Sequence, residues 1–186
     1  MEQLIDYINK YTKLDKDAIA ELEKRAEIET YKKGELVLDV GKVCNKIWYI
    51  KSGMVRKFHL YNGKEVTIWI HCENEIITSL HSYFHKSATS EYIQACETTE
   101  LIGINRENSE KLAKFPQFVT FSNALMGEQF ASVDLVTREF AQMDAKQRYE
   151  YLRRIAPNMI RRAKLGYIAS IIGITQETLS RIRKQI

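Results

Sequence analysis

The sequence is poor in the features that mark secreted, disulfide-bonded or membrane-spanning proteins. Its 186 residues include two prolines and three cysteines, and no apolar run approaches the ~18 residues of a membrane-spanning helix. Cys44, Cys72 and Cys96 are widely spaced and odd in number, unlike a disulfide framework or a zinc or iron–sulfur site. Residues 1–17 contain acidic side chains and no continuous apolar region, so they do not resemble a secretory signal. We therefore expect a cytoplasmic protein with reduced, partly buried thiols and no membrane partner.

The residue patterns of common active sites are also missing from the sequence. It has four histidines but no His-x-His pair, and it contains no pattern of a nucleophile with its base. His81 and His85 are four residues apart and would share a helix face, a spacing that can hold a metal but more often arises by chance. We therefore predict no catalytic residue, no metal site and no cofactor. A cupin-like metal-dependent enzyme is the alternative, and stoichiometric iron, nickel or manganese would favour it.

Basic charge is concentrated at the C-terminal end of the chain. The formal net charge is +4, but residues 144–186 carry ten Lys or Arg and three Asp or Glu, a net +7, whereas residues 1–143 carry −3. A basic segment on a mildly acidic remainder suits a polyanionic partner that binds at one end only. Solvated surface charge would explain the same numbers. Charge alone therefore does not indicate a polyanionic partner unless a binding motif coincides with it.

Two short amphipathic helices are predicted on either side of Gly173. Glycine readily adopts the positive φ that ends a helix, and Thr175 is a suitable N-cap for the second helix. The apolar face of the first helix consists of Leu165, Ile168, Ala169 and Ile172. The second helix has Leu179, Ile182 and Ile186 on its apolar side, and Glu177, Ser180, Arg181 and Lys184 opposite, with Gln176 at the margin. Small Ala169 permits a close crossing, so the pattern favours a DNA-binding helix-turn-helix over a bland helical hairpin.

The rest of the chain divides into helical ends and a strand-rich middle. Residues 4–29 are predicted to be helical, in two pieces divided near "TKLDKD", and "NEIITSLHSYFHK" holds a short helical turn. The Asn-Gly of "NGK" predicts a hairpin turn, because both residues tolerate positive φ. Short strands at this spacing predict a closed or sandwiched antiparallel sheet. The expected strands are "ELVLDV", "KIWYIKSG", "MVRKFHLY", "EVTIWIHC", "EYIQAC" and "ELIGIN".

A long helix is predicted from Phe118 to Met143. Apolar residues of this helix recur at intervals of seven. A second set, three residues after each of them, completes a heptad pattern but is polar at two positions. Such a pattern is typical of a helix that pairs with a second copy of the chain. Burial of this helix within a monomer is the competing interpretation. Asp144 is expected to end it and to cap a helix at 145–159, which Pro157 interrupts before the final two helices. The dimer-interface candidates are Val119, Met126, Gln129, Val133, Val136 and Phe140. Phe118, Phe121, Leu125 and Leu135 are expected to pack on the strands.

Several stretches of the chain resemble the Crp/Fnr family of bacterial transcription regulators. "YKKGELVLDVGKVCNKIWYIKSGMVRKF" resembles the first strands of that family, with Gly34, Gly41 and Gly53 at turns. "NGKEVTIWIHCENEI" resembles the hairpin before the ligand loop, and "GITQETLSRIRK" resembles the recognition helix. The resemblance implies an α+β fold: a jelly-roll-like, cyclic-nucleotide-binding-like β-roll with a dimerisation helix at residues 1–143, then a helix-turn-helix domain at 144–186.

By this resemblance, the base-contacting positions are Gln176, Glu177 and Arg181. Family members usually follow the recognition helix with a two-stranded wing that touches the DNA backbone, for which this sequence has no residues left. We therefore expect the phosphate contacts to come from basic residues elsewhere. The DNA-binding candidates are Thr175, Gln176, Glu177, Thr178, Ser180, Arg181, Arg183, Lys184, Arg161, Arg162 and Lys164.

The effector pocket that the resemblance implies departs from the pattern of the family. Family members typically bind cyclic AMP with a Gly-Glu pair at the ribose and an Arg-Ser pair at the phosphate. Here the pairs are Asn74-Glu75 and Thr89-Ser90, so the phosphate-binding arginine is replaced by Thr89. A buried phosphate without a cation is costly, and we expect no tight binding of cyclic AMP. The effector-pocket candidates are Glu75, Thr89, Ser90, Val133 and Asp134.

The resemblance also names the expected partners. We expect a homodimer that binds double-stranded DNA at two half-sites about 34 Å apart, with the long helix transmitting any signal from the β-roll. RNA polymerase and an unidentified small-molecule effector are further candidates. The remaining alternative is a ligand-binding module that docks a protein partner through the terminal helix pair.

Overall fold

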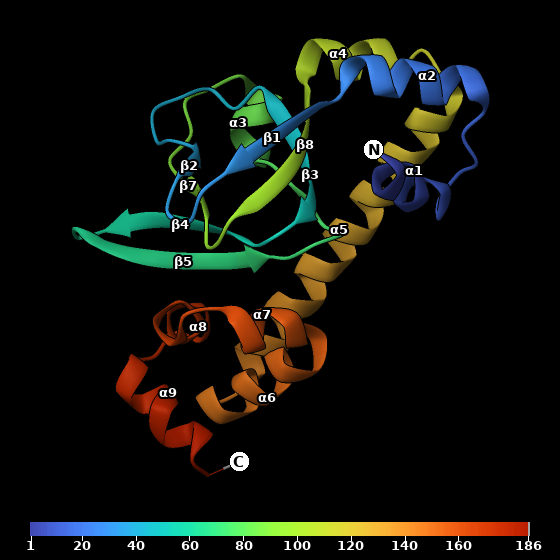
Figure 1. Ribbon diagram of the computed structural model, residues 1–186. Coiled ribbons are helices and arrows are strands. Elements are labelled where there is room, and N and C mark those ends of the chain that lie inside the picture. The colour runs from blue at the N-terminus through green and yellow to red at the C-terminus, as the bar shows by residue number, and fades with distance from the viewer. Residues whose placement is uncertain (186) are drawn as a thin grey trace.

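In the computed structural model, residues 1–185 are described, and they form eight strands and nine helices (Figure 1). The strands pair antiparallel in two four-stranded sheets, of order β1-β8-β3-β6 and β2-β7-β4-β5. The predicted α+β class and antiparallel β-roll are thereby confirmed. The strands are β1 (Glu27–Tyr31), β2 (Leu36–Leu38), β3 (Lys46–Ser52), β4 (Val55–Tyr61), β5 (Lys64–His71), β6 (Ile76–Ile77), β7 (Tyr92–Ala95) and β8 (Thr99–Asn105).

The two sheets enclose an apolar core. Six of its buried side chains are Leu38, Trp48, Ile50, Val55, Ile93 and Leu101. The hairpin between β4 and β5 turns at Asn62 and Gly63, whose φ angles are 49° and 74°. Positive φ at both positions is what a two-residue hairpin turn requires, so the turn predicted at "NGK" is confirmed.

Two helices precede the roll, α1 (Glu2–Asn9) and α2 (Lys16–Arg25), and Asp15 caps α2 by accepting from the Ala18 N–H at 2.8 Å. The prediction of helix as far as residue 29 is wrong at its end. Ala26 has an extended backbone, with φ −88° and ψ 138°, and Glu27 already pairs with Gly103 in β8. Cross-strand pairing at the sheet edge determines the conformation of this segment.

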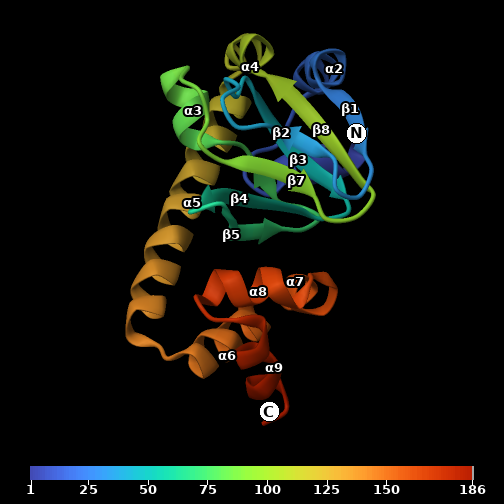
Figure 2. The same cartoon turned by 90° about the vertical axis from the view of Figure 1, so that its left-hand side faces the viewer.

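Three further helices lie between β6 and the C-terminal part: α3 (Leu80–His85), α4 (Arg106–Leu112) and α5 (Pro116–Gln142). The short helix in "NEIITSLHSYFHK" and the long helix are both confirmed. The first half of α5 packs on α1 and the roll through Phe118, Phe121 and Leu125. Its second half runs away from the sheets (Figure 2), and Leu135 is 42% exposed there, which corrects the expectation that this leucine packs on the strands.

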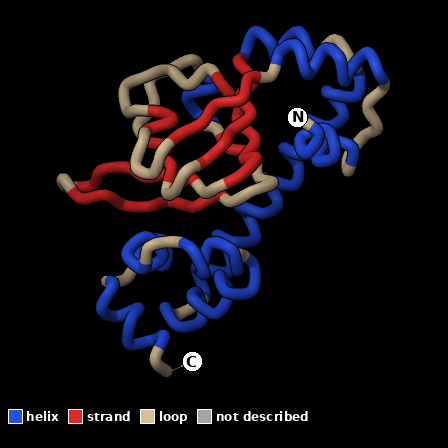
Figure 3. Tube along the Cα trace, viewed as in Figure 1, coloured by secondary structure: helices blue, strands red, loops and turns tan. Residues whose placement is uncertain are grey.

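As far as residue 185, the C-terminal segment consists of four helices and no strand (Figure 3): α6 (Ala145–Ile155), α7 (Pro157–Arg162), α8 (Leu165–Ile172) and α9 (Gln176–Arg183). Asp144 forms a capping box with Gln147 at the start of α6, as its expected capping role requires. Pro157 does interrupt the helix, but it also begins α7, because the first position of a helix needs no N–H donor. Three helices therefore follow Pro157, where two were expected.

The C-terminal segment and the β-roll share one apolar core. Met54, Ile70 and Cys72 of the roll pack in the same cluster as side chains from all four of its helices. These helical members include Leu152, Met159, Ile168, Ala169, Ile172 and Leu179. The helix-turn-helix is therefore fixed against the underside of the roll, below β4 and β5 as drawn in Figure 1. No helix among the described residues has both the length and the apolar character that crossing a membrane requires.

Candidate nucleic-acid interface and effector cavity

Helices α8 and α9 cross closely at a glycine turn. Ala169 and Leu179 are 1% and 0% exposed, and Gly173 has φ 79°. The hydroxyl of Thr175 accepts a hydrogen bond from the Thr178 N–H at 3.3 Å, so the predicted glycine turn and N-cap are both confirmed. Ile186, expected on the apolar side of α9, lies outside the described residues.

The opposite side of α9 faces solvent. Its exposed residues include Gln176, Glu177, Arg181, Arg183 and Lys184. A groove of about 300 Å³ runs between the start of α8 and this face, lined by Leu165, Gln176, Glu177 and Ser180. The Glu177 N–H and the Thr175 hydroxyl lower the pKa of the Glu177 carboxyl, which is therefore an ionised acceptor at neutral pH. The face thus presents donors and acceptors of hydrogen bonds side by side.

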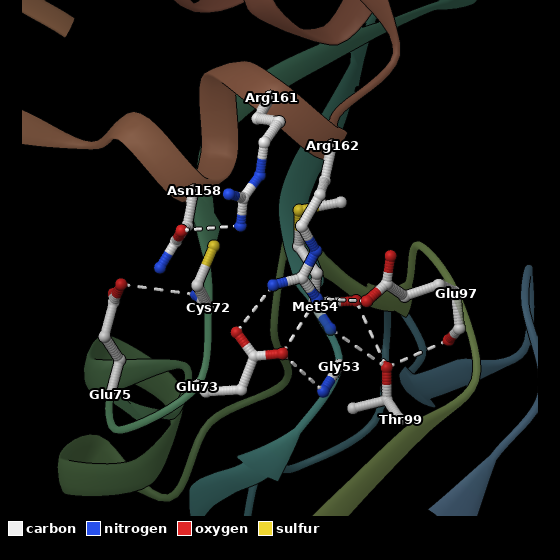
Figure 4. A network of polar contacts seen from close by, with 10 residues as sticks. All are labelled: Gly53, Met54, Cys72, Glu73, Glu75, Glu97, Thr99, Asn158, Arg161 and Arg162. Carbon is white, nitrogen blue, oxygen red and sulfur yellow. Dashed lines mark hydrogen bonds and ion pairs between the residues drawn. The ribbon is translucent and has the colours of Figure 1, made fainter. Parts of the chain in front are cut away.

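Among the predicted phosphate-binding residues, Arg161 and Lys164 are exposed, but Arg162 is engaged within the chain (Figure 4). Its Nη1 and Nη2 donate to the two carboxylate oxygens of Glu73 at 2.7 and 2.8 Å, and Nη2 also bonds Glu97. The Gly53 N–H donates to the same Glu73 carboxylate at 3.0 Å. These partners, Arg162 first, hold the pKa of Glu73 below its usual value. The network joins α7 to two turns of the roll.

A second contact between the helix-turn-helix and the roll is formed by a buried arginine. Arg56 is 2% exposed, and its guanidinium lies 4.0 Å from the ring centroids of both Phe58 in β4 and Tyr167 in α8. It donates to the Gln94 side chain at 2.8 and 2.6 Å and to Glu65 at 2.6 Å. Such stacking of a desolvated guanidinium between two rings is favourable, and it contributes to the attachment of α8.

Nearby, the side chain of Ser170 in α8 accepts a hydrogen bond from the Thr67 N–H at 2.8 Å. Thr67 belongs to β5, the edge strand of its sheet. The serine hydroxyl therefore provides an acceptor for a backbone N–H on the open edge of the sheet. Neither this contact nor the role of Arg56 was foreseen from the sequence, because nothing in a strand pattern indicates which helix will cover the sheet.

A cavity of about 140 Å³ in the roll is lined by Ser79, His81, Ser82, Thr89, Ser90 and Glu91. Two of the five effector-pocket candidates, Thr89 and Ser90, therefore line it. The Thr89 hydroxyl is already bonded to the Ser79 hydroxyl at 3.0 Å and to the Glu91 backbone. The Glu91 carboxylate is paired with Lys57 at 3.0 Å. The buried hydroxyl of Thr89 and the Glu91 carboxylate thus already have partners within the chain.

The other three effector-pocket candidates do not line this cavity. Glu75 turns back on its own loop, where its oxygens meet the Cys72 N–H at 3.2 Å and His71 Nδ1 at 2.8 Å. Asn74 has φ 66° at the position of the glycine expected from the family resemblance. Asparagine tolerates this left-handed conformation better than most residues, so the backbone turn is kept without glycine. Val133 and Asp134 are exposed on α5.

Most of the predicted dimer face is exposed along α5. Val119, Met126 and Val133 are 42%, 44% and 63% exposed, and Gln129 is exposed as well. Val136 is half-buried, and Phe140 packs against Tyr151 of α6, with ring centroids 6.0 Å apart. The largest exposed apolar side chain of this helix, Phe130 at 77%, was missed. Phe130 follows Gln129 directly and therefore flanks the heptad seam. Including the positions that flank the seam would have identified it as an interface candidate.

The histidines and cysteines form no site among the described residues. His81 and His85 stack on α3 with ring centroids 4.6 Å apart, and no group of three His, Cys, Asp or Glu side chains in residues 1–185 is placed to hold a metal. The three cysteines are free, as expected, with Cys44 and Cys72 buried and Cys96 half-buried. Burial raises the pKa of Cys72 to about 12 and that of Cys96 to about 11, so both remain protonated thiols at neutral pH.

Comparison with known proteins agrees with this architecture. Residues 28–114 match the family model of the cyclic nucleotide-binding domain. CooA of Carboxydothermus hydrogenoformans, solved as a mutant, is 21% identical, with a TM-score of 0.69 over 88% of this chain and 77% of that one. The c-di-GMP-responsive global regulator CLP of Xanthomonas campestris is 14% identical, with a TM-score of 0.70 over 92% and 91%.

A Eubacterium rectale protein described as a transcriptional regulator of the Crp/Fnr family is 18% identical, with a TM-score of 0.70 over 97% of this chain and 87% of that one. At these identities the likeness is one of fold. A search of curated proteins finds no match. The resemblance predicted from the sequence is nevertheless confirmed, because the family model matches the β-roll and a Crp/Fnr structure matches this fold over nearly the whole chain.

Proposed function

We propose that this chain, which combines a cyclic nucleotide-binding domain with the fold of the Crp/Fnr regulators, is a dimeric, sequence-specific DNA-binding transcription regulator. Its domains are the β-roll with α5 at residues 1–143 and the helix-turn-helix domain from residue 144. RNA polymerase and a small-molecule effector are partners that the family likeness suggests. Regulators of this fold act on DNA in bacterial cells, and the proposal places this chain in the cytoplasm.

The exposed face of α9 is the observation that carries the proposal. Leu179 anchors the helix in the core, and the side chains on the other side project from the molecule. Arg181 suits two hydrogen bonds to guanine, Glu177 can accept from cytosine N4, and Gln176 can pair with adenine. Thr175, Thr178 and Ser180 supply hydroxyls along the same helix, and Arg183 and Lys184 add charge at its end.

Phosphate contacts are proposed for the exposed basic residues around α9. Arg161, Lys164, Arg183 and Lys184 are exposed and so can reach a duplex without rearrangement. Arg162 would first have to leave Glu73 and Glu97. A charge of this size should make binding weaken steeply as salt concentration rises.

The exposed apolar stripe on α5 supports pairing of two copies. Val119, Met126, Phe130 and Val133 together present an apolar surface on α5, whose residues 126–135 are all exposed. Surfaces of this kind mark interaction sites, and a two-fold dimer about α5 would bury it. The two α9 helices would then enter successive major grooves about 34 Å apart.

The direct test is a gel-shift assay against a pool of random duplexes, followed by selection and sequencing of the bound DNA. The proposal predicts enrichment of a two-fold-symmetric site. The substitution Arg181→Ala should then cost about 1–3 kcal/mol on that site and relax the preference at one base position. Equal weakening on all sequences would make Arg181 a phosphate contact, and failure to bind any duplex at low salt would refute the proposed function.

We also propose that cyclic AMP is not the effector. The cavity beside Thr89 has no arginine in its lining, and the hydroxyls of Ser79, Ser82 and Thr89 are already bonded within the chain. A cyclic phosphate would therefore lose its water without gaining a cation. Isothermal calorimetry with cyclic AMP should give no heat of tight binding, whereas micromolar or stronger affinity would refute this part of the proposal.

A further inference from the structure

Arg148 lies at the elbow between the long helix and the helix-turn-helix. It belongs to the first turn of α6, and its Nε donates to the Phe140 carbonyl of α5 at 3.0 Å. Its Nη1 donates to the Ile172 carbonyl, the last of α8, at 3.2 Å. One guanidinium thus joins the C-terminal ends of α5 and α8, and Ile172 is 24 residues from Arg148 in the chain.

Both carbonyls lie in the last turn of their helices, where the regular N–H donors run out, although the Phe140 carbonyl also accepts from the Met143 N–H at 3.4 Å. A cation is favoured there because the helix dipole places partial negative charge at that end. Lysine would offer one compact ammonium, whereas the planar guanidinium presents donors in two directions at fixed angles. Arg148 therefore constrains the direction of α8 relative to α5, in addition to neutralising the partial negative charge at the two helix ends.

Other contacts make the same elbow rigid. Only Met143 and Asp144 separate α5 from α6, and the capping box of Asp144 and Gln147 fixes the start of α6. The Phe140 ring packs edge-on against Tyr151, and the Arg148 guanidinium lies 5.7 Å from the centroid of the Phe140 ring. The angle between α5 and the helix-turn-helix is therefore set by direct contacts, and Arg148 hydrogen-bonds to both α5 and α8.

We propose that Arg148 is a positioning residue that sets the spacing between the two DNA half-sites which the dimer accepts. This inference rests on the proposed function, because it needs two copies paired along α5 and a duplex bound by both α9 helices. A change in the angle at the elbow moves each α9 relative to the two-fold axis. Each base pair inserted between half-sites moves them apart by about 3.4 Å and rotates them by about 34–36°, so a rigid elbow tolerates few spacings.

The experiment uses the full chain and the half-site obtained by selection from random duplexes. Affinity is measured for a duplex carrying one half-site and for two-fold duplexes whose half-sites are separated by one-base-pair steps. The variants are Arg148→Met, which keeps an unbranched apolar stem but removes the donors, and Arg148→Lys, which keeps the charge. Arg153→Met, an exposed arginine of the same helix, is the matched control.

Wild type should show one preferred spacing, and Arg148→Met should lower the ratio between the best and the next spacing by about tenfold, the range expected for lost charged hydrogen bonds. Affinity for the single half-site should stay the same, and Arg148→Lys should lie between the two profiles. Arg153→Met should keep the spacing profile even if a lost phosphate contact weakens every duplex equally.

Two results would overturn the assignment. An unchanged spacing profile in Arg148→Met would show that other contacts fix the elbow. Equal weakening of the single half-site and of all spacings would make Arg148 a DNA contact or a general stabiliser. Melting temperature and sedimentation of each variant separate these results from misfolding or loss of the dimer. If wild type itself binds no duplex, the proposed function fails instead, and this inference fails with it.

Discussion

Arg162 and Glu73 form a bidentate ion pair where α7 meets the turn after β5. The Nη1–Oε2 and Nη2–Oε1 distances are 2.7 and 2.8 Å, and the side chains are 23% and 29% exposed. Two parallel hydrogen bonds between guanidinium and carboxylate are both directional and charge-assisted. Glu97 binds the same guanidinium, so one residue of the C-terminal segment is tied to two turns of the β-roll.

Removing this arginine should destabilise the chain. In Arg162→Met the carboxylates of Glu73 and Glu97 would lie close together without their shared cation. Hydrogen bonds to charged groups contribute about 1.5–3 kcal/mol when well formed, and partial exposure to solvent lowers the expected loss to about 1–2 kcal/mol. Urea denaturation followed by circular dichroism measures the change in the free energy of unfolding.

The neighbouring arginine provides the control. Arg161 is exposed on the same helix, and its one side-chain contact among the described residues is to Asn158 at 3.1 Å (Figure 4). Arg161→Met should change the free energy of unfolding by no more than about 0.5 kcal/mol. Equal effects of the two substitutions would mean that the pair with Glu73 contributes nothing specific.

The same ion pair should make stability depend on pH in the acid range. Arg162 lowers the pKa of Glu73 in the folded chain, whereas the unfolded chain has the ordinary value of about 4.3. The stabilisation is therefore complete above that value and is lost as the pH falls through the lowered pKa. The difference in unfolding free energy between wild type and Glu73→Gln should be constant near neutrality and shrink below about pH 4. A difference that stays constant to pH 3 would contradict this.

The sequence was sufficient to predict the elements whose determinants are local. Alternating apolar residues predicted six strands, Asn62-Gly63 predicted the hairpin turn, and Gly173 with Thr175 predicted the helix-turn-helix. In each case the residue itself restricts the backbone or supplies the cap. The first three residues of β1, 27–29, were mistaken for helix, because the strand is held by its partner β8 and has no strong pattern of its own.

Contacts between distant segments could not be predicted in this way. Arg162 was assigned to DNA phosphate because it lies in a basic run, but its partners Glu73 and Glu97 are 89 and 65 residues away. Arg56 lies in a predicted strand, but the strand pattern did not indicate that Tyr167 of α8 would pack on its guanidinium. Which charges become paired depends on how the C-terminal segment packs on the roll, and that information lies in the tertiary structure.

Phe130 should be essential for pairing of two copies but not for folding. It is 77% exposed on α5, so a glutamate there disturbs no packing within the chain. In a two-fold dimer the residue is lost from both copies, and burial of one such side chain is worth about 1.5–3 kcal/mol. Phe130→Glu should therefore sediment as a monomer with nearly unchanged circular dichroism. Persistence of a dimer in this variant would place the interface elsewhere.

Gly173 should be required for the stability of the helix-turn-helix because of its backbone conformation alone. Its φ is 79°, and an added Cβ would meet only the Arg148 Nη1 at 3.7 Å, an ordinary contact. Gly173→Ala should therefore cost about 1–2 kcal/mol, the penalty for an L-residue in left-handed backbone. Gly173→Asn adds a larger side chain but tolerates this conformation better, so it should cost less. If urea denaturation showed the asparagine variant to be the less stable one, steric crowding would be the cause, and the backbone argument would be wrong.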